Sequence, residues 1–272
     1  MLGLADDSAL LRHEICYVLG QLRKAKAIPV LVDLLEVDRD VMVRHEAAEA
    51  LGAIADPALL VQEQLDLVVD VLKVASTLPR FPSCTKITFV VLLLNYFFLA
   101  NPLFSLQKFL LDAAPEVSET CQVALDGIQW RIENAEKRET LLENEEFSSI
   151  DPAPPASKKE KSVQQLRDLL LNPDKPTFKR YRALFSLRNI NTAEAVLAVC
   201  DALNTGSDLF RHEVAFVLGQ MEHPASVPAL VKALQDTTQH AMVRHEAAEA
   251  LGSIASPEVG SRAFYAFAAN AT

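Results

Sequence analysis

Apolar residues recur every three to four positions through most of the chain, which is the pattern of amphipathic helices. In residues 27–37 the apolar side chains at 28, 31 and 35 fall on one helical face. Residues 40–55 form a second amphipathic helical pattern. A short charged loop separates the two segments. Two antiparallel helices in about 32 residues form the unit of an α-solenoid. The pattern appears again at residues 226–236 and in the segment after Gln239.

One short motif marks this unit. Arg-His-Glu occurs four times, at residues 12–14, 44–46, 211–213 and 244–246. The first two histidines are 32 positions apart and the last two are 33 apart, while His13 and His212 are separated by 199. The chain is therefore a tandem pair of repeats that has itself been duplicated. We predict an all-α solenoid, an α-α superhelix, in two pseudo-symmetric halves.

Neighbouring repeats keep the packing pattern but lack the motif. Residues 115–128 align with 41–54, with Glu119-Thr120 at the motif position. Residues 177–184 align with 209–216, with Arg180-Tyr181 in place of His-Glu. Helix stacking therefore does not require His-Glu, which indicates that the motif has a function.

Composition changes along the chain predict its organisation. Residues 87–107 carry no charge and have the length of a membrane span, although Asn95, Asn101 and Pro102 argue against one. This stretch lies within about 40 residues that separate a helix ending near Val74 from its expected partner, where a connection of a few residues is usual. We expect N-terminal repeats with two motifs at 1–75, an apolar insertion foreign to the repeat at 76–112, a closing helix at 113–134, an exposed linker at 135–161, and C-terminal repeats with two motifs at 162–272.

The charge balance limits the choice of partner. The 26 basic and 36 acidic side chains give a formal net charge of −10. This excludes a basic nucleic-acid footprint and suits a cationic partner. The four cysteines are scattered, and the N-terminal stretch lacks the features of a signal peptide. We therefore expect a cytoplasmic protein with reduced thiols that does not span a membrane.

The motif brings metal-ligating groups together. Inner helices of neighbouring repeats lie about 10 Å apart, so His13 and Glu14 should lie beside His45 and Glu46. The duplication supplies a second set, His212, Glu213, His245 and Glu246. Imidazole and carboxylate without cysteine is a ligand set for iron, manganese or zinc. If the halves face each other, two metals could bind dioxygen between them, whereas isolated surface His-Glu pairs are usually solvated.

Two further glutamates follow one helical turn after a motif histidine. Glu49 follows His45 and Glu249 follows His245 on the same helix face. They either orient the imidazoles as supporting groups or pair with Arg44, Arg244 or solvent.

The four motif segments "RHEICYVLGQ", "VRHEAAEALGAIA", "RHEVAFVLGQ" and "VRHEAAEALGSIA", with "DPAPP" in the linker, resemble the deoxyhypusine hydroxylase family. The similarity covers about residues 1–74 and 113–256. The resemblance implies a HEAT-repeat monooxygenase with a dinuclear Fe²⁺ centre, two irons per chain. It also implies hydroxylation, with dioxygen, of the deoxyhypusine side chain of translation initiation factor five-A to form hypusine.

The resemblance also implies roles for the motif residues. His13, His45 and Glu46 would bind one iron, and His212, His245 and Glu246 the other. The resemblance leaves open whether Glu14 and Glu213 are ligands or carboxylates that bind the substrate amine. A non-catalytic HEAT scaffold for a basic partner and a zinc hydrolase on the same ligands are the alternatives.

The chain departs from the family pattern at both ends as well as in the insertion. It opens almost on the first motif helix, where the second half has the Arg180-Tyr181 repeat, and it ends soon after the last motif helix.

Overall fold

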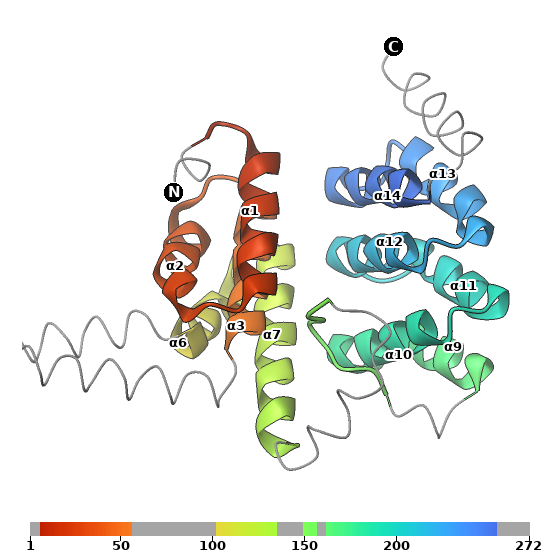
Figure 1. The fold of residues 1–272 in the computed structure, drawn as a ribbon, viewed down its shortest axis with the longest axis horizontal. Helices are drawn as coiled ribbons and strands as arrows, with labels where there is room; N and C mark the ends of the chain where they lie inside the picture. Colours follow the sequence, from red (N-terminus) through yellow and green to blue (C-terminus); the bar gives the residue numbers. More distant parts are fainter. Residues whose placement is uncertain (1–5, 56–101, 135–148, 157–161, 255–272) are drawn as a thin grey trace, which may run out of the picture. The chain divides into compact units, whose positions relative to one another are not determined.

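A computed structural model describes residues 6–55, 102–134, 149–156 and 162–254 (Figure 1). The chain divides into two compact units, Met1–Glu143 and Asn144–Thr272. The described residues contain α-helices and short 3-10 turns and no strand.

The first unit is a two-layer stack of helices. Helices α1, α3 and α7 pack side by side, and α2 and α6 form the second layer against them. The bounds are α1 Ala9–Leu22, α2 Ile28–Val37, α3 Val41–Ile54, α6 Pro102–Lys108 and α7 Pro115–Glu133, with 3-10 turns at Ala25–Ala27 (η2) and Phe109–Leu111 (η3).

The second unit repeats this architecture. Its inner layer is α10, α12 and α14, and each inner helix packs against the outer helix that precedes it (Figure 1). The bounds are α9 Val163–Leu171, α10 Thr177–Ile190, α11 Ala193–Cys200, α12 Asp208–Met221, α13 Val227–Gln235 and α14 Ala241–Ser253, with 3-10 turns at Asp201–Asn204 (η5) and Pro224–Ser226 (η6). The predicted all-α solenoid of helix pairs is confirmed.

Equivalent helices begin in the same way in both units. Ser8 caps α1 by accepting a hydrogen bond from the Leu11 N–H, and Ser207 caps α12 by accepting one from the Phe210 N–H. A serine at this position satisfies an N–H group that the helix itself leaves unbonded. The duplication therefore extends from the motif to the local signal that starts its helix.

A glycine–alanine contact sets the spacing between inner helices. A Cβ atom built on Gly20 of α1 would lie 2.9 Å from the Cα atom of Ala50 in α3, and one built on Gly219 of α12 would lie 3.0 Å from the Cα atom of Ala250 in α14. A Cβ atom on Gly52 would lie 2.7 Å from the Ala124 Cβ atom in α7. Each of these glycines lies where the next inner helix comes closest, so a side chain there would collide with an alanine of that helix. This close contact explains why "Leu-Gly" accompanies the motif.

The predicted boundary of the apolar insertion differs from the structure. Residues 102–111 form α6 and η3, and Leu106 is fully buried in the first core, with Leu103, Phe109 and Leu110 packed around it. Asp112 then pairs with Arg44 of α3, with 2.6 Å between Oδ1 and Nη2. The apolar residues at this end of the segment therefore fill the repeat, and they are not foreign to it. Residues 76–101 lie outside the described residues.

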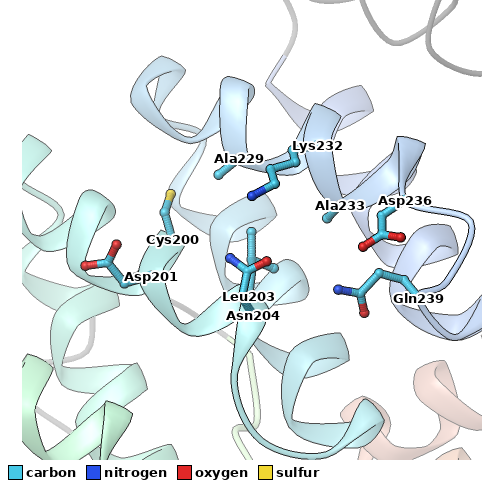
Figure 2. Close-up of a pocket in the computed structure, with 9 residues that line it drawn as sticks. All are labelled: Cys200, Asp201, Leu203, Asn204, Ala229, Lys232, Ala233, Asp236 and Gln239. Carbon is cyan, nitrogen blue, oxygen red and sulfur yellow. The ribbon is translucent and has the colours of Figure 1, made fainter.

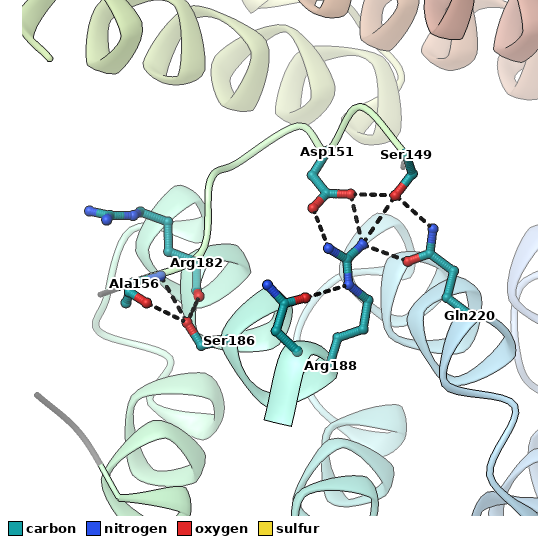
Figure 3. Close-up of polar contacts among 8 residues, drawn as sticks. Ser149, Asp151, Ala156, Arg182, Ser186, Arg188 and Gln220 are labelled. Carbon is teal, nitrogen blue, oxygen red and sulfur yellow. Dashed lines mark hydrogen bonds and ion pairs between the residues drawn. The ribbon is translucent and has the colours of Figure 1, made fainter. Parts of the chain in front are cut away.

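The end of the predicted linker is also part of a unit. Arg188 of α10 is 1 % exposed and pairs with the carboxylate of Asp151 through two nitrogens, at 2.6 and 2.8 Å (Figure 3). Arg188 also donates to Gln220 of α12, whose amide donates to Ser149. The segment 149–156 is thus held on α10 and α12 and is not an exposed linker. Residues 135–148 and 157–161 lie outside the described residues.

No helix in the described part of the chain is both long enough and apolar enough to cross a bilayer. Residues 87–101 of the uncharged stretch and residues 255–272 lie outside the described residues.

Two identically placed glycines test the close approach. Gly52 and Gly252 occupy the same position in nearly identical helices, but no described residue lies within 4 Å of a Cβ atom on Gly252. Gly252→Ala should raise the free energy of unfolding by about 0.5–1 kcal/mol, because alanine loses less backbone entropy in a helix. Gly52→Ala should lower it by about 1–3 kcal/mol, because the new methyl group overpacks the contact with Ala124. Denaturant unfolding of both variants measures the difference, and equal effects would contradict the packing argument.

A leucine pair tests whether residues 102–111 belong to the core. Leu106 is fully buried and Leu111 is 94 % exposed. Leu106→Ala should cost about 2–5 kcal/mol of unfolding free energy through lost burial and the resulting cavity. Leu111→Ala is the control and should change it by less than about 0.5 kcal/mol. If Leu106→Ala is as neutral as its control, residues 102–111 do not contribute to the core.

Candidate functional site

The motif side chains of the first unit meet between α1 and α3. The Nε2 atom of His13 lies 3.3 Å from Oε2 of Glu46, and the rings of His13 and His45 are 5.6 Å apart between centroids. His13, His45 and Glu46 are buried, whereas the side chain of Glu14 is 44 % exposed and its Oε1 atom lies 3.0 Å from Nδ1 of His13. The predicted adjacency of the two motifs is present in this unit.

The second unit repeats the contact between α12 and α14. Nε2 of His212 lies 3.3 Å from Oε2 of Glu246, the same pair of atoms at the same distance as in the first unit. His212, Glu213 and Glu246 are buried. His245 lies one residue before Glu246, and its Nε2 atom is 3.0 Å from Oε1 of Glu249. Each unit therefore carries one His–Glu contact across two helices, with a second histidine on the later helix.

The charge around His13 favours a cation. Burial by itself lowers the pKa of an imidazole, but the carboxylates of Glu46 and Glu14 more than offset it and raise the pKa of His13 to about 9. The site between α1 and α3 therefore stabilises a positive charge.

Glu249 lies beside His245, as the spacing of one helical turn predicted. A carboxylate beside a ligating imidazole can hold the plane and tautomer of the ring, and here Oε1 of Glu249 lies 3.0 Å from Nε2 of His245. Of the two arginines, Arg244 donates to the Leu234 carbonyl and Arg44 pairs with Asp112. Glu49, half-buried, holds the equivalent position on α3.

The motif arginines have a role that the sequence analysis missed. Arg12 forms a bidentate pair with Asp38 in the turn before α3, at 2.8 and 3.0 Å, and both side chains are 6 % exposed. Arg211 makes the equivalent reach to Gln239 in the turn before α14. Each arginine thus ties a motif helix to the start of the next inner helix. The recurrence of arginine before every histidine is the signal that could have revealed this.

A pocket of about 230 Å³ lies elsewhere in the second unit, on α11, η5 and α13 (Figure 2). Its carboxylates are already engaged, because Asp201 pairs with Arg167 and Asp236 accepts hydrogen bonds from Thr238. The pocket contains none of the predicted site residues. Its lining is Cys200, Asp201, Leu203, Asn204, Ala229, Lys232, Ala233, Asp236 and Gln239.

The donor set between the motif helices fits a metal ion. Each unit presents buried imidazole and carboxylate groups in contact, and the described cysteines, Cys16, Cys121 and Cys200, are buried thiols outside the motifs. Histidine and carboxylate side chains on facing helices are ligands of iron, manganese and zinc. This chemistry does not by itself choose among the three metals.

Comparison with protein families finds HEAT repeats at residues 2–76 and 196–262, and a PBS lyase HEAT-like repeat at 179–205. The chain is 43 % identical to the deoxyhypusine hydroxylase of Mus musculus over 256 residues, which cover 94 % of this chain and 69 % of that protein. It is 43 % identical to the Homo sapiens protein (93 % and 68 % covered) and 42 % identical to that of Candida albicans (93 % and 67 % covered).

A solved structure gives the same relationship. The structure of human deoxyhypusine hydroxylase in complex with glycerol matches with a TM-score of 0.74 and 41 % sequence identity. The match covers 98 % of this chain and 75 % of the human chain.

Proposed function

The chain belongs to the deoxyhypusine hydroxylase family, and we propose that it hydroxylates the deoxyhypusine side chain with two iron ions, one held by each unit. It is an enzyme that converts deoxyhypusine to hypusine. In a monooxygenase reaction, one oxygen atom of dioxygen is inserted into a C–H bond, and the other is reduced to water by two electrons and two protons from an external reductant.

The duplicated His–Glu contact is the observation that carries the proposal. His13 with Glu46 and His212 with Glu246 contact at the same distance in two separate units, and all four side chains are buried. Buried ionisable groups are costly unless they are paired or bind a cation. The neighbouring repeats stack without this pair, so packing does not account for it.

We assign the ligands by unit. His13, His45 and Glu46 hold one iron, and His212, His245 and Glu246 hold the other. Iron bound there supplies the activation of dioxygen. The protein's own contribution is to fix the imidazoles, and Glu249 does so for His245.

Glu14 and Glu213 are proposed to bind the amine of the substrate side chain. Glu14 is partly exposed and lies on the His13 side of the first site, and Glu213 holds the equivalent position on α12. A net charge of −10 adds a long-range attraction for a cationic side chain. The proposed protein substrate is the deoxyhypusine form of translation initiation factor five-A, and the proposed location is the cytoplasm, where such a factor works.

Family membership does not favour the alternatives. A HEAT scaffold that binds a basic partner without catalysis would have no use for buried His–Glu pairs repeated in register. A zinc hydrolase would use the same ligands but would not need dioxygen, which a hydroxylation consumes.

Iron content tests the ligand assignment. His45→Ala and His245→Ala should each remove the iron of their own unit, so that iron per chain falls to about half, because each deletes a nitrogen ligand of a single site. His223→Ala is the control. His223 caps η6 by accepting a hydrogen bond from the Ala225 N–H and lies outside the motifs. Elemental analysis of each purified variant, with circular dichroism to check folding, measures the effect.

Wild-type iron content in both His45→Ala and His245→Ala would refute the assignment. If the purified protein contains stoichiometric zinc in place of iron, and its turnover needs no dioxygen, the chain is a zinc hydrolase and the two-iron proposal is wrong.

Glu14→Gln and Glu213→Gln test substrate binding separately from metal binding. Each variant keeps the shape of the side chain and removes its charge. We expect iron to be retained and the affinity for a deoxyhypusine-containing protein to fall by about 1.5–3 kcal/mol, the value of a hydrogen bond to a charged group. Titration calorimetry measures the affinity. Loss of iron in both variants would instead make these carboxylates metal ligands.

A further inference from the structure

Arg180 holds the motif position in the repeat that lacks His-Glu. It lies on α10 at the place that His212 takes on α12, and it is 5 % exposed. Arginine has no acceptor atom, so it cannot serve there as a metal ligand. A buried guanidinium is also costly unless its charge and its donors are engaged. Its contacts therefore indicate what this position does in the second unit.

The guanidinium of Arg180 lies over an aromatic ring at the start of α12. Its Cζ atom is 3.7 Å from the centroid of the Phe210 ring, and its Nε atom donates to the Leu170 carbonyl of α9 at 2.9 Å. A cation over a ring face is attracted by the negative charge of the π-system. Phe210 is fully buried, and its ring is also 5.9 Å from the Tyr181 ring between centroids. Arg180 thus connects α9, α10 and the first turn of α12.

The loop before α12 leaves room for this contact. Gly206 has a φ of 79°, and a Cβ atom built on it would lie 2.9 Å from Cδ1 of Phe210 and 3.2 Å from Nη1 of Arg180. Glycine takes this left-handed conformation without strain and has no side chain to collide with the pair. The Gly206 carbonyl accepts a hydrogen bond from Arg211, which also donates to Gln239 in the turn before α14. The loop is therefore held from α10 and, through Arg211, from the start of α14.

These contacts converge on the residues that precede a motif histidine. Phe210 and Arg211 come directly before His212, and the Phe210 N–H donates to the side chain of Ser207, the cap of α12. A shift of this first turn would move the His212 imidazole relative to Glu246, whose Oε2 atom is 3.3 Å from it. Groups that hold a metal ligand in place contribute to the affinity for the metal.

We propose that Arg180 is a positioning residue for the second iron site. It acts through the Phe210 ring, which fixes the first turn of α12 and with it the placement of His212. The proposal rests on the proposed function, in which His212, His245 and Glu246 hold an iron. It gives the repeat without His-Glu a role in the metal binding of its neighbour.

The iron affinity of the intact chain tests this role. In the His45→Ala chain we expect iron only in the second unit, and anaerobic titration of Fe²⁺ against a chromogenic chelator measures its dissociation constant. Arg180→Met keeps the length of the side chain and removes the guanidinium, and Phe210→Leu removes the ring. Each, added to His45→Ala, should raise the dissociation constant about tenfold, as when a group that supports a ligand is lost. The double variant should be no weaker than the more severe single variant, because both changes remove one contact.

Leu166→Ala, in the same background, separates positioning from general stability. Leu166 is 3 % exposed on α9, the outer helix that packs against α10. Its loss leaves a cavity beneath the outer layer, so it should lower the melting temperature at least as much as Arg180→Met and leave the dissociation constant unchanged. Circular dichroism follows the melting of each variant. Phe210→Leu removes the same contact from its other side, so the test remains decisive if Arg180→Met does not fold.

Two results would overturn the inference alone. If Arg180→Met and Phe210→Leu bind iron as tightly as the His45→Ala parent, Arg180 does not position the site. If Leu166→Ala weakens iron binding as much as they do, the effect is one of general stability. A His45→Ala parent that binds no iron would instead refute the proposed ligand set, and the inference would fall with it.

Discussion

The close approach of neighbouring inner helices is the constraint on which the rest of the structure depends. Gly20 and Gly219 have no side chain, so the backbones of α3 and α14 can come within contact distance of the preceding helix. The motif histidines lie two helical turns before these glycines. The same helix spacing therefore lets His13 contact Glu46 in the first unit and His212 contact Glu246 in the second. A larger residue at either glycine would separate the helices and with them the imidazole and carboxylate. Packing and chemistry therefore share one geometric requirement.

The motif arginines add a second, polar restraint to the same interface. Arg12 and Arg211 each reach from a motif helix to the turn that starts the next inner helix. The glycine contact fixes how far apart the helices are, and the arginine contact fixes where along their length they meet. The first unit uses a carboxylate, Asp38, and the second uses the amide of Gln239, so the restraint is an ion pair in one and a neutral-acceptor bond in the other. Arginine's planar group with several donors suits both partners.

The two units share their interior and differ at their ends. Helix α12 has a preceding repeat against it and α3 has α7 after it, whereas α1 and α14 present exposed faces in the described structure. In a solenoid each repeat contacts only its neighbours, so stability and solubility are decided mainly by how the terminal repeats are covered. The proposed iron ligands lie on the inner helices α1, α3, α12 and α14, and α1 and α14 are the two helices with exposed faces. The apolar contacts that cover these two helices therefore contribute to the stability of the proposed iron sites.

The sequence by itself determined the helix pairs, the duplication and the family. The period of apolar residues placed a helix at 40–55, where α3 spans Val41–Ile54, and the four copies of Arg-His-Glu marked the helices whose histidines and glutamates contact each other. Such local patterns need no knowledge of packing. Only the tertiary structure decided that residues 102–111 fill the first core and that Asp151 pairs with Arg188. An apolar or charged run has the same composition whether it packs or stays exposed, and its partner is chosen by the distance and angle at which helices far apart in sequence meet.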